Sequence, residues 1–219
     1  MRALHRRAFL TSAVAAAAPR SSSIDRALRE GIAARGIPCV AAMAATDKQV
    51  LYEGAFGRRD DSGVRARPDS IFSIASMTKA ITTVAALQLV EQGRLQLHEP
   101  ISKLLNEFEQ IEVLEEFDDE GKPMLRRAKT AVTLHHLLTH TSGLGYDIWN
   151  ARLLRYNAAK PPRRPGPLLF EPGTAWQYGT GIDVAGRLVE RVSGVTLEAY
   201  FQKNILEPLG MADTSYLVP

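Results

Sequence analysis

The sequence predicts an α/β fold in which an antiparallel sheet domain is followed by a mostly helical domain. Two apolar runs, 40–45 and 50–56, flank the polar turn Thr46-Asp47-Lys48 and are typical of a β-hairpin. A buried apolar helix is expected over 77–92, where Gly93 is placed to end it. Further helical periodicity appears in the second half of the chain. We therefore assign residues 21–95 to the sheet domain and residues 96–219 to the helical domain.

The composition is that of a globular protein. Of the 219 residues, 45% are hydrophobic and 23% are charged. The formal net charge is +3, and Arg2, Arg6 and Arg7 alone supply three positive charges, so the rest of the chain has a net charge of zero. Such a domain, without a basic patch, gives no indication of nucleic-acid binding. The single cysteine, Cys39, excludes an internal disulfide and is expected to be a buried, inert thiol.

Residues 1–18 read as a targeting segment. The pair Arg6-Arg7 precedes Phe9-Leu10 and an alanine-rich stretch that ends before Pro19, which resembles a twin-arginine export signal. This predicts a periplasmic or secreted protein. The alternative is an alanine-rich tail on a cytoplasmic protein. No stretch of about 18 apolar residues follows, so we expect no stable membrane span.

The remaining elements follow from local signals. A surface helix is expected over 23–35, because Gly36-Ile37-Pro38 ends its periodic pattern. The acidic stretch 107–120 is followed by basic residues at 122–129, which predicts a solvated hairpin or loop with charge pairs across it. The other expected elements are a short helix 133–139 capped by Thr133, a proline-rich loop 160–167, and amphipathic helices over 181–194 and 196–205.

The first constellation that can carry chemistry is an S-x-x-K motif, Ser76 to Lys79, at the start of the apolar helix. The hydroxyl and the amine share one face of a helical turn. The helix N-terminus favours a developing alkoxide, and burial is expected to lower the pKa of Lys79 until its neutral amine accepts the serine proton. The alternative is a structural one, a helix cap by Ser70, Ser73 or Ser76 and a solvent-facing lysine.

The second constellation is the turn 171–180, which reads EPGTAWQYGT and presents Trp176 and Tyr178 just before a helix. A phenol beside two cations can lose or relay a proton. Tyr178 would therefore suit a general base for acylation and a general acid for the leaving group. The alternative is a core tyrosine whose hydroxyl is satisfied by hydrogen bonds.

Together these motifs resemble the serine β-lactamase-like and penicillin-binding-protein superfamily over nearly all of residues 24–216. The resemblance includes SMTK, GRLQL at 93–97, LHHLLTHTSGL at 134–144, PGTAWQYG and EPLGM at 207–211. The charged insert FDDEGKPMLRRAK and the following GYDIW look most like the esterases related to class C β-lactamases. The implied architecture is a β-lactamase/transpeptidase-like fold, with an antiparallel sheet domain and a mostly helical domain.

The resemblance also implies a mechanism. Ser76 would attack an ester carbonyl to form an acyl-enzyme, Lys79 and Tyr178 would move protons, and water would release the acid. Three further residues, Trp176, Thr180 and Tyr146, are expected to bind the substrate, a small-molecule ester or β-lactam-like compound. No cofactor and no metal ion is expected.

Two departures from the family pattern matter. β-Lactamases carry Tyr-x-Asn where this chain has Tyr178-Gly179-Thr180, and the missing carboxamide favours esters over β-lactams. The family also ordinarily continues through three further strands, one of which supplies the second oxyanion-hole amide. We therefore expect a C-terminally truncated chain with an incomplete sheet domain and impaired activity, because one oxyanion donor is typically worth about 10²–10³ in rate.

Other functions remain open at this point. One is a β-lactamase or DD-peptidase-like penicillin-binding protein, and another is a catalytically impaired fragment with only a binding role. A third is metal-dependent hydrolysis, because His136 and His140 are four residues apart on an expected helix. Leu137 stands where the H-E-x-x-H motif has glutamate, however, and no third ligand is evident.

Overall fold

The computed structural model describes residues 22–159 and 165–216. The expected targeting segment, 1–18, and most of the expected proline-rich loop, 160–167, lie outside these residues. The chain divides into two compact units, with the boundary between Phe72 and Ser73. We call them the hairpin unit and the helical unit. Within the described residues, no helix is long and apolar enough to cross a membrane.

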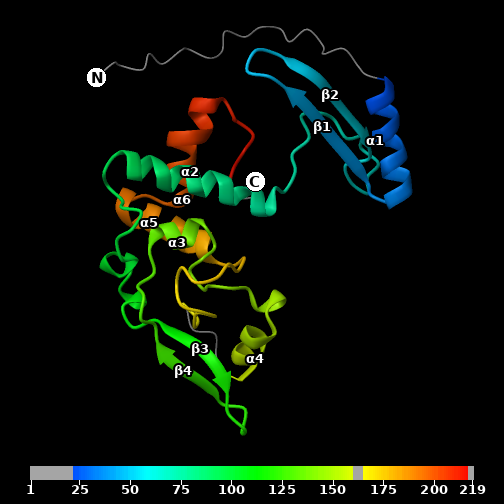
Figure 1. The fold of residues 1–219 in the computed structure, drawn as a ribbon. Helices are drawn as coiled ribbons and strands as arrows, with labels where there is room; N and C mark the ends of the chain where they lie inside the picture. Colours follow the sequence, from blue (N-terminus) through cyan, green and yellow to red (C-terminus); the bar gives the residue numbers. More distant parts are fainter. Residues whose placement is uncertain (1–21, 160–164, 217–219) are drawn as a thin grey trace. The chain divides into compact units, whose positions relative to one another are not determined.

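The hairpin unit consists of one helix beside a two-stranded antiparallel sheet (Figure 1). Its elements are α1 (Ser22–Arg35), β1 (Cys39–Ala45) and β2 (Val50–Gly57), close to the predicted bounds. The register pairs Cys39 with Gly57. Two contacts fix the helix to β2: the Tyr52 hydroxyl donates to the carboxylate of Asp25 at 2.8 Å, and the guanidinium of Arg29 lies 4.2 Å from the centroid of the Phe56 ring. The single cysteine, Cys39, is half-buried and not fully buried as expected, because β1 belongs to a two-stranded sheet among the described residues.

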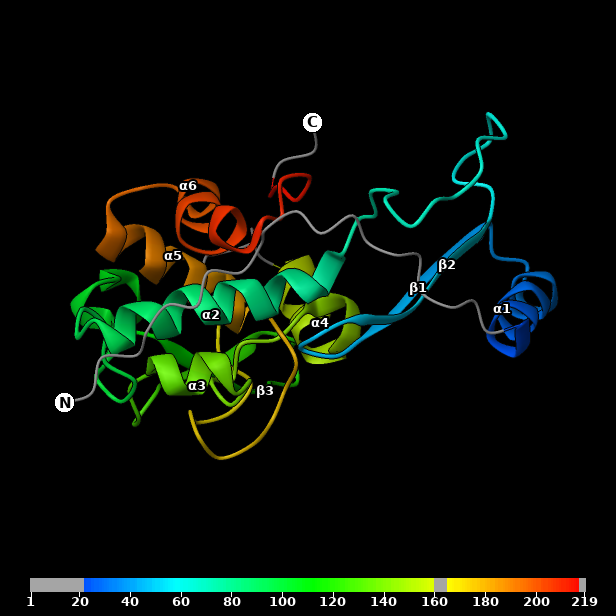
Figure 2. The ribbon, with the colours of Figure 1, turned by 90° about the horizontal axis from the view of Figure 1, so that it is seen from above.

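The helical unit is built around one long helix, α2, which runs alongside α5 (Figure 2). Its longer helices and its strands are α2 (Thr78–Glu91), α4 (Ala151–Ala159), α5 (Gly181–Ser193), β3 (Glu112–Phe117) and β4 (Pro123–Arg127). Two five-residue α-helices, α3 (Leu134–Leu138) and α6 (Leu197–Phe201), complete it, and a π-helical turn, Gln202–Leu206, extends α6. Short 3-10 turns lie at Ala75–Met77, Ile101–Lys103, Asn106–Phe108, Asp147–Trp149 and Glu207–Leu209.

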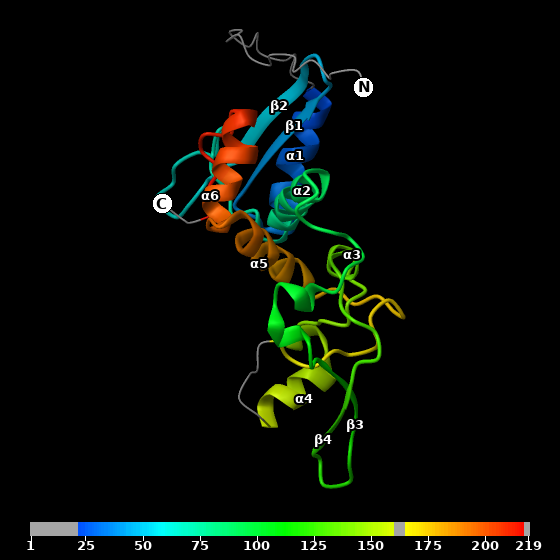
Figure 3. The ribbon, with the colours of Figure 1, turned by 90° about the vertical axis from the view of Figure 1, so that its left-hand side faces the viewer.

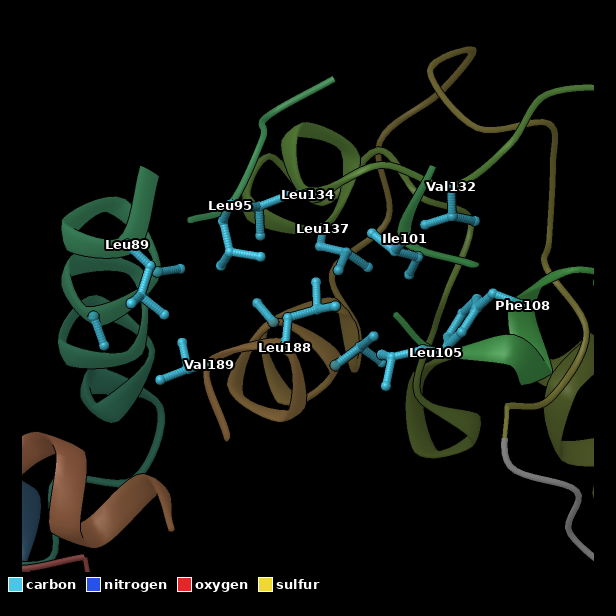
Figure 4. Packing of buried hydrophobic residues seen from close by; sticks show 14 of the residues in the cluster. Leu89, Leu95, Ile101, Leu105, Phe108, Val132, Leu134, Leu137, Leu188 and Val189 are labelled. Atoms are coloured by element: carbon cyan, nitrogen blue, oxygen red, sulfur yellow. The ribbon is translucent and has the colours of Figure 1, made fainter. Parts of the chain in front are cut away.

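One hydrophobic core holds the helical unit together. Leu89 of α2, Leu137 of α3 and Leu188 of α5 are completely buried and converge on it, as Figure 4 shows. Burying such side chains is the main favourable term for folding, at about 25 cal/mol per Å² of apolar surface. Thr133 and Thr196 cap α3 and α6 by accepting backbone N–H hydrogen bonds, which confirms Thr133 as a cap.

The β3–β4 hairpin lies at the end of the helical unit opposite α6, next to α4 (Figure 3). Its acidic and basic residues pair as predicted, because Arg126 on β4 binds Glu115 on β3. Arg126 also binds Glu171, whose carboxylate accepts hydrogen bonds from the backbone N–H groups of Lys129 and Thr130. This network ties the base of the hairpin to the start of the turn 171–180.

The helix α2 differs from its sequence-based expectation in how it is buried. The helix expected to be buried all round is buried on one face only: Ala80, Val84 and Leu87 form an exposed stripe along α2. In addition, α2 packs against α5 in the helical unit, so the contacts divide the chain before this helix. The domain boundary predicted between residues 95 and 96 is not tested by this division and stays a prediction.

Candidate active site

Ser76 lies in the 3-10 turn that leads into α2, within one turn of the helix N-terminus. The structural alternative, in which a serine caps this helix, does not hold, because the N-cap positions, Ile74 for the 3-10 turn and Met77 for α2, make no side-chain cap. The hydroxyl of Ser70 instead accepts a hydrogen bond from the backbone of Arg67. The Ser76 hydroxyl is therefore not engaged in capping the helix and faces other side chains.

Lys79 and Tyr178 both reach that hydroxyl. Lys79 follows one helical turn later, and its Nζ lies 3.3 Å from Ser76 Oγ. The hydroxyl of Tyr178, which is 102 residues away in the sequence, lies 2.7 Å from the same oxygen. The fold therefore brings the three predicted catalytic residues together around one oxygen atom, from two segments of the helical unit.

Close backbone packing holds the turn that carries Tyr178. The N–H of Gln177 donates to the carbonyl of His140 at 2.9 Å. Gly179 lies so near the segment after α3 that a Cβ there would come within 2.2 Å of the Leu144 carbonyl oxygen. Glycine is therefore required beside Tyr178, because a side chain at this position would push the two segments apart.

The predicted substrate-binding residues differ in their contacts. Tyr146 belongs to the site: its ring lies 5.7 Å from the Tyr178 ring, and its hydroxyl donates to Asp183 at 3.4 Å. Trp176 is 65% exposed and meets the His140 ring edge-on at 6.1 Å. Thr180 is the N-cap residue of α5, and its side chain makes no capping hydrogen bond.

Sequence reasoning missed Trp149 and the contact of His140 with the site. The Trp149 ring lies 5.4 Å from the rings of both Tyr146 and Tyr178, and it is 61% exposed. His140, considered only as a metal ligand, has its ring 4.8 Å from that of Tyr178. The GYDIW segment gave a signal for Trp149, since binding residues are often carried on loops.

The electrostatics of the site favour a charged lysine and an acidic phenol. Burial lowers the pKa of Lys79, but its hydrogen bonds with Tyr178 and Tyr146 outweigh burial, so the pKa of Lys79 is raised. This corrects the expectation of a neutral amine. The pKa of Tyr178 is lowered, first by its hydrogen bond with Ser76 and next by that with Lys79. The pKa of Tyr146 is raised by burial and by the negative charge of Asp183.

The two histidines considered as zinc ligands have separate local roles. His136 completes the cap of α3, because its Nδ1 accepts a hydrogen bond from the backbone N–H of Thr133. His140 faces Tyr178. Within the described ranges, no cluster of three or more His, Cys, Asp or Glu side chains is placed to hold a metal ion.

The β-lactamase family model matches residues 24–219. The chain is 38% identical to a monacolin J acid methylbutanoyltransferase from Aspergillus terreus, over 92% of this chain and 53% of the relative. It is 35% identical to the esterase EstB from Burkholderia gladioli, over 96% of this chain and 54% of the relative. The chain thus spans about half the length of the curated relatives it matches.

A solved structure shows the same fold. A mutant of simvastatin synthase from Aspergillus terreus superposes with a TM-score of 0.79 at 41% sequence identity, over 86% of this chain and 48% of that one. The likeness agrees with the β-lactamase/transpeptidase-like fold expected from the sequence.

Proposed function

Since the chain belongs to the β-lactamase family, we propose that it is a serine hydrolase that cleaves small-molecule esters through a covalent acyl-enzyme, with Ser76 as the nucleophile. The observation that carries the proposal is the double approach to Ser76 Oγ, by the Tyr178 hydroxyl at 2.7 Å and by Lys79 Nζ at 3.3 Å. A nucleophile within hydrogen-bond reach of a base, which is itself held by a third group, is the signature of covalent catalysis.

Tyr178 is the better candidate for the general base. Its pKa is lowered and that of Lys79 is raised, so Tyr178 gives up its proton more readily than a free phenol does, beside a charged Lys79. In acylation, Ser76 Oγ attacks the ester carbonyl while its proton passes to Tyr178. Tyr178 then gives that proton to the departing alkoxide, which leaves as the alcohol. Lys79 keeps its charge throughout and stabilises the phenolate.

Deacylation repeats these steps with water as the nucleophile. Tyr178 takes a proton from the water that attacks the acyl-enzyme carbonyl and returns it to Ser76 Oγ, so the acid is released and the enzyme is restored. Because Tyr178 must be deprotonated to act, the acylation rate should rise as the pH passes through its lowered pKa. The Tyr178→Phe variant should lose about 10²–10⁴ in rate.

The decisive experiment compares two serine substitutions. Ser76→Ala should abolish hydrolysis of short-chain p-nitrophenyl esters and labelling by a fluorophosphonate probe, because it removes the nucleophile. Ser73→Ala is the matched control, since it makes the same change three residues earlier, before the 3-10 turn, and should leave both signals intact. Labelling requires only a single attack by Ser76 on the probe, so it also detects an enzyme whose turnover is slow. Unchanged turnover in Ser76→Ala, or a wild-type chain that the probe does not label, would contradict the proposal.

Transfer to an alcohol is the second candidate reaction, and the names of the relatives favour it, because they include methylbutanoyltransferases as well as esterases. The same acyl-enzyme serves both reactions, since an alcohol can replace water as the nucleophile. A large excess of a small alcohol during p-nitrophenyl ester turnover distinguishes them. A new ester product indicates transfer, and free acid alone indicates hydrolysis.

A further inference from the structure

Backbone strain is concentrated at the proposed site. Among the described residues, two that are not glycine have a positive φ: Ala75 at 43° and His140 at 56°. Ala75 immediately precedes Ser76, and His140 contacts Tyr178. The left-handed region is unfavourable for residues with a Cβ, and such residues persist where the surrounding structure imposes them, often at functional sites.

His140 holds Tyr178 through both its backbone and its ring. Its carbonyl accepts the hydrogen bond from the Gln177 N–H, one residue before Tyr178. Its imidazole lies 4.8 Å from the centroid of the Tyr178 ring and 6.1 Å from that of Trp176, which it meets edge-on. The imidazole thus lies near both aromatic side chains of the turn 171–180.

A second unfavourable feature of His140 is a nitrogen atom of its ring. Its Nδ1 is buried and finds no hydrogen-bond partner among the described residues. A buried polar atom without a partner destabilises a protein. Because both the backbone angle and this nitrogen are unfavourable for stability, another reason for a histidine at this position is needed.

The ring is surrounded by the charged and titratable groups of the site. Lys79 approaches from α2, Asp183 from α5 and Tyr178 from the turn. Burial lowers the pKa of His140 and the charge of Lys79 lowers it further, while Asp183 opposes them. A neutral ring can therefore lie beside the Lys79 ammonium without repelling it.

We infer that His140 is a positioning residue for the proposed reaction. Its imidazole packs against the Tyr178 ring and keeps that ring in the orientation in which the Tyr178 hydroxyl is hydrogen-bonded to Ser76 Oγ. Without the imidazole, the Tyr178 side chain can rotate away from both Ser76 and Lys79. The inference rests on the proposed function, because it assigns His140 a role through the proposed base.

The test measures the rate of fluorophosphonate labelling of Ser76 against pH in three variants. His140→Asn removes the ring but keeps a residue that tolerates positive φ, and it should label about tenfold more slowly. Its pH dependence should move to higher pH, because a displaced phenol loses the hydrogen bonds that lower its pKa. His140→Phe keeps a ring and should retain most of the rate. His135→Asn, the same change at an exposed position of α3, should behave as the wild type.

Other outcomes would contradict either the inference about His140 or the proposed function. An Asn variant with the wild-type rate and pH dependence would overturn the inference. So would equal losses in the Asn and Phe variants, or an Asn variant that fails to fold, because these show a role for the ring nitrogens or for the fold. If the wild type is not labelled at all, the proposed function fails instead. The pKa of Tyr178, followed by NMR of ¹³C-labelled tyrosine, then tests the positioning alone and should rise in His140→Asn.

Discussion

The hairpin unit and the helical unit differ in how much they bury. Of the described residues in the hairpin unit, Tyr52, Phe56 and Ala66 are the buried hydrophobic side chains, and α1 has no fully buried residue. The helical unit encloses a continuous core that includes Leu89 and Leu188. A two-stranded hairpin is marginal by itself, whereas a packed helical core can hold side chains rigidly. The proposed catalytic residues all lie on the unit that has a core.

The largest expected effect tests this difference in packing. Leu89→Ala should lower the free energy of unfolding by about 3 kcal/mol, because the side chain is completely buried between α2 and its neighbours. Leu51→Ala in the hairpin unit is the matched control. Leu51 is 45% exposed, so its loss should cost less than about 1 kcal/mol. Denaturant unfolding measures both, and equal losses would mean that the two units are not different in this way.

A smaller effect is expected where the two segments of the site meet. Gly179→Ala places a methyl group against the Leu144 carbonyl, which should destabilise the helical unit by about 1–3 kcal/mol. The displaced Tyr178 should also slow labelling of Ser76. Gly31→Ala is the control, since nothing lies within 4 Å of a Cβ there. Thermal unfolding and labelling should both distinguish the variants, and wild-type labelling in Gly179→Ala would show that the close approach does not set the site.

Low pH should destabilise the helical unit through protonation of Glu171. Burial opposes ionisation of this carboxylate, but hydrogen bonds from Arg126 and from two backbone N–H groups outweigh burial, so its pKa is lowered. A lowered folded-state pKa stabilises the protein above the unfolded value, and that stability is lost as the pH falls toward the folded value. Glu171→Gln should cost about 1–2 kcal/mol at neutral pH and less in acid. Unfolding curves at pH 7 and pH 4 check the sign, and a cost that grows in acid would contradict it.

The smallest effect belongs to the hairpin unit. The pKa of Asp69 is lowered by its hydrogen bond with Arg67, but both side chains are largely exposed. Exposed ion pairs contribute little to stability. Asp69→Asn should therefore leave the melting temperature unchanged within error, at low and at high salt. A clear drop would show that the loop before Ser73 matters more than its exposure suggests.

The sequence predicted the elements whose signals are local. The turn at Thr46-Asp47-Lys48 and the cap at Thr133 set the bounds of the nearby strands and helix. Ser76 and Lys79 could be paired because helical spacing alone puts them on one face. Tyr178 was added from the resemblance of its motif to a known family, since no local rule places a residue 102 positions away.

What the sequence could not predict depends on packing between distant segments. The sign of the Lys79 pKa shift depends on two tyrosines from other segments, so burial alone gave the wrong direction. The positive φ of His140 and its contact with Tyr178 arise where the segment after α3 meets the turn 171–180. The exposed stripe on α2 could not be seen in its composition, because an all-apolar helix does not show which face is covered.

The most direct test of Ser76 as the nucleophile is to locate the covalent adduct. The protein is labelled with a fluorophosphonate, digested, and the modified peptide is sequenced by mass spectrometry. Three serines, Ser70, Ser73 and Ser76, are close together in the sequence and serve as internal controls for one another. We expect a single adduct on Ser76, which is absent from Ser76→Ala and formed more slowly in Tyr178→Phe. An adduct on another residue, or ester hydrolysis that continues without any adduct on Ser76, would contradict this expectation.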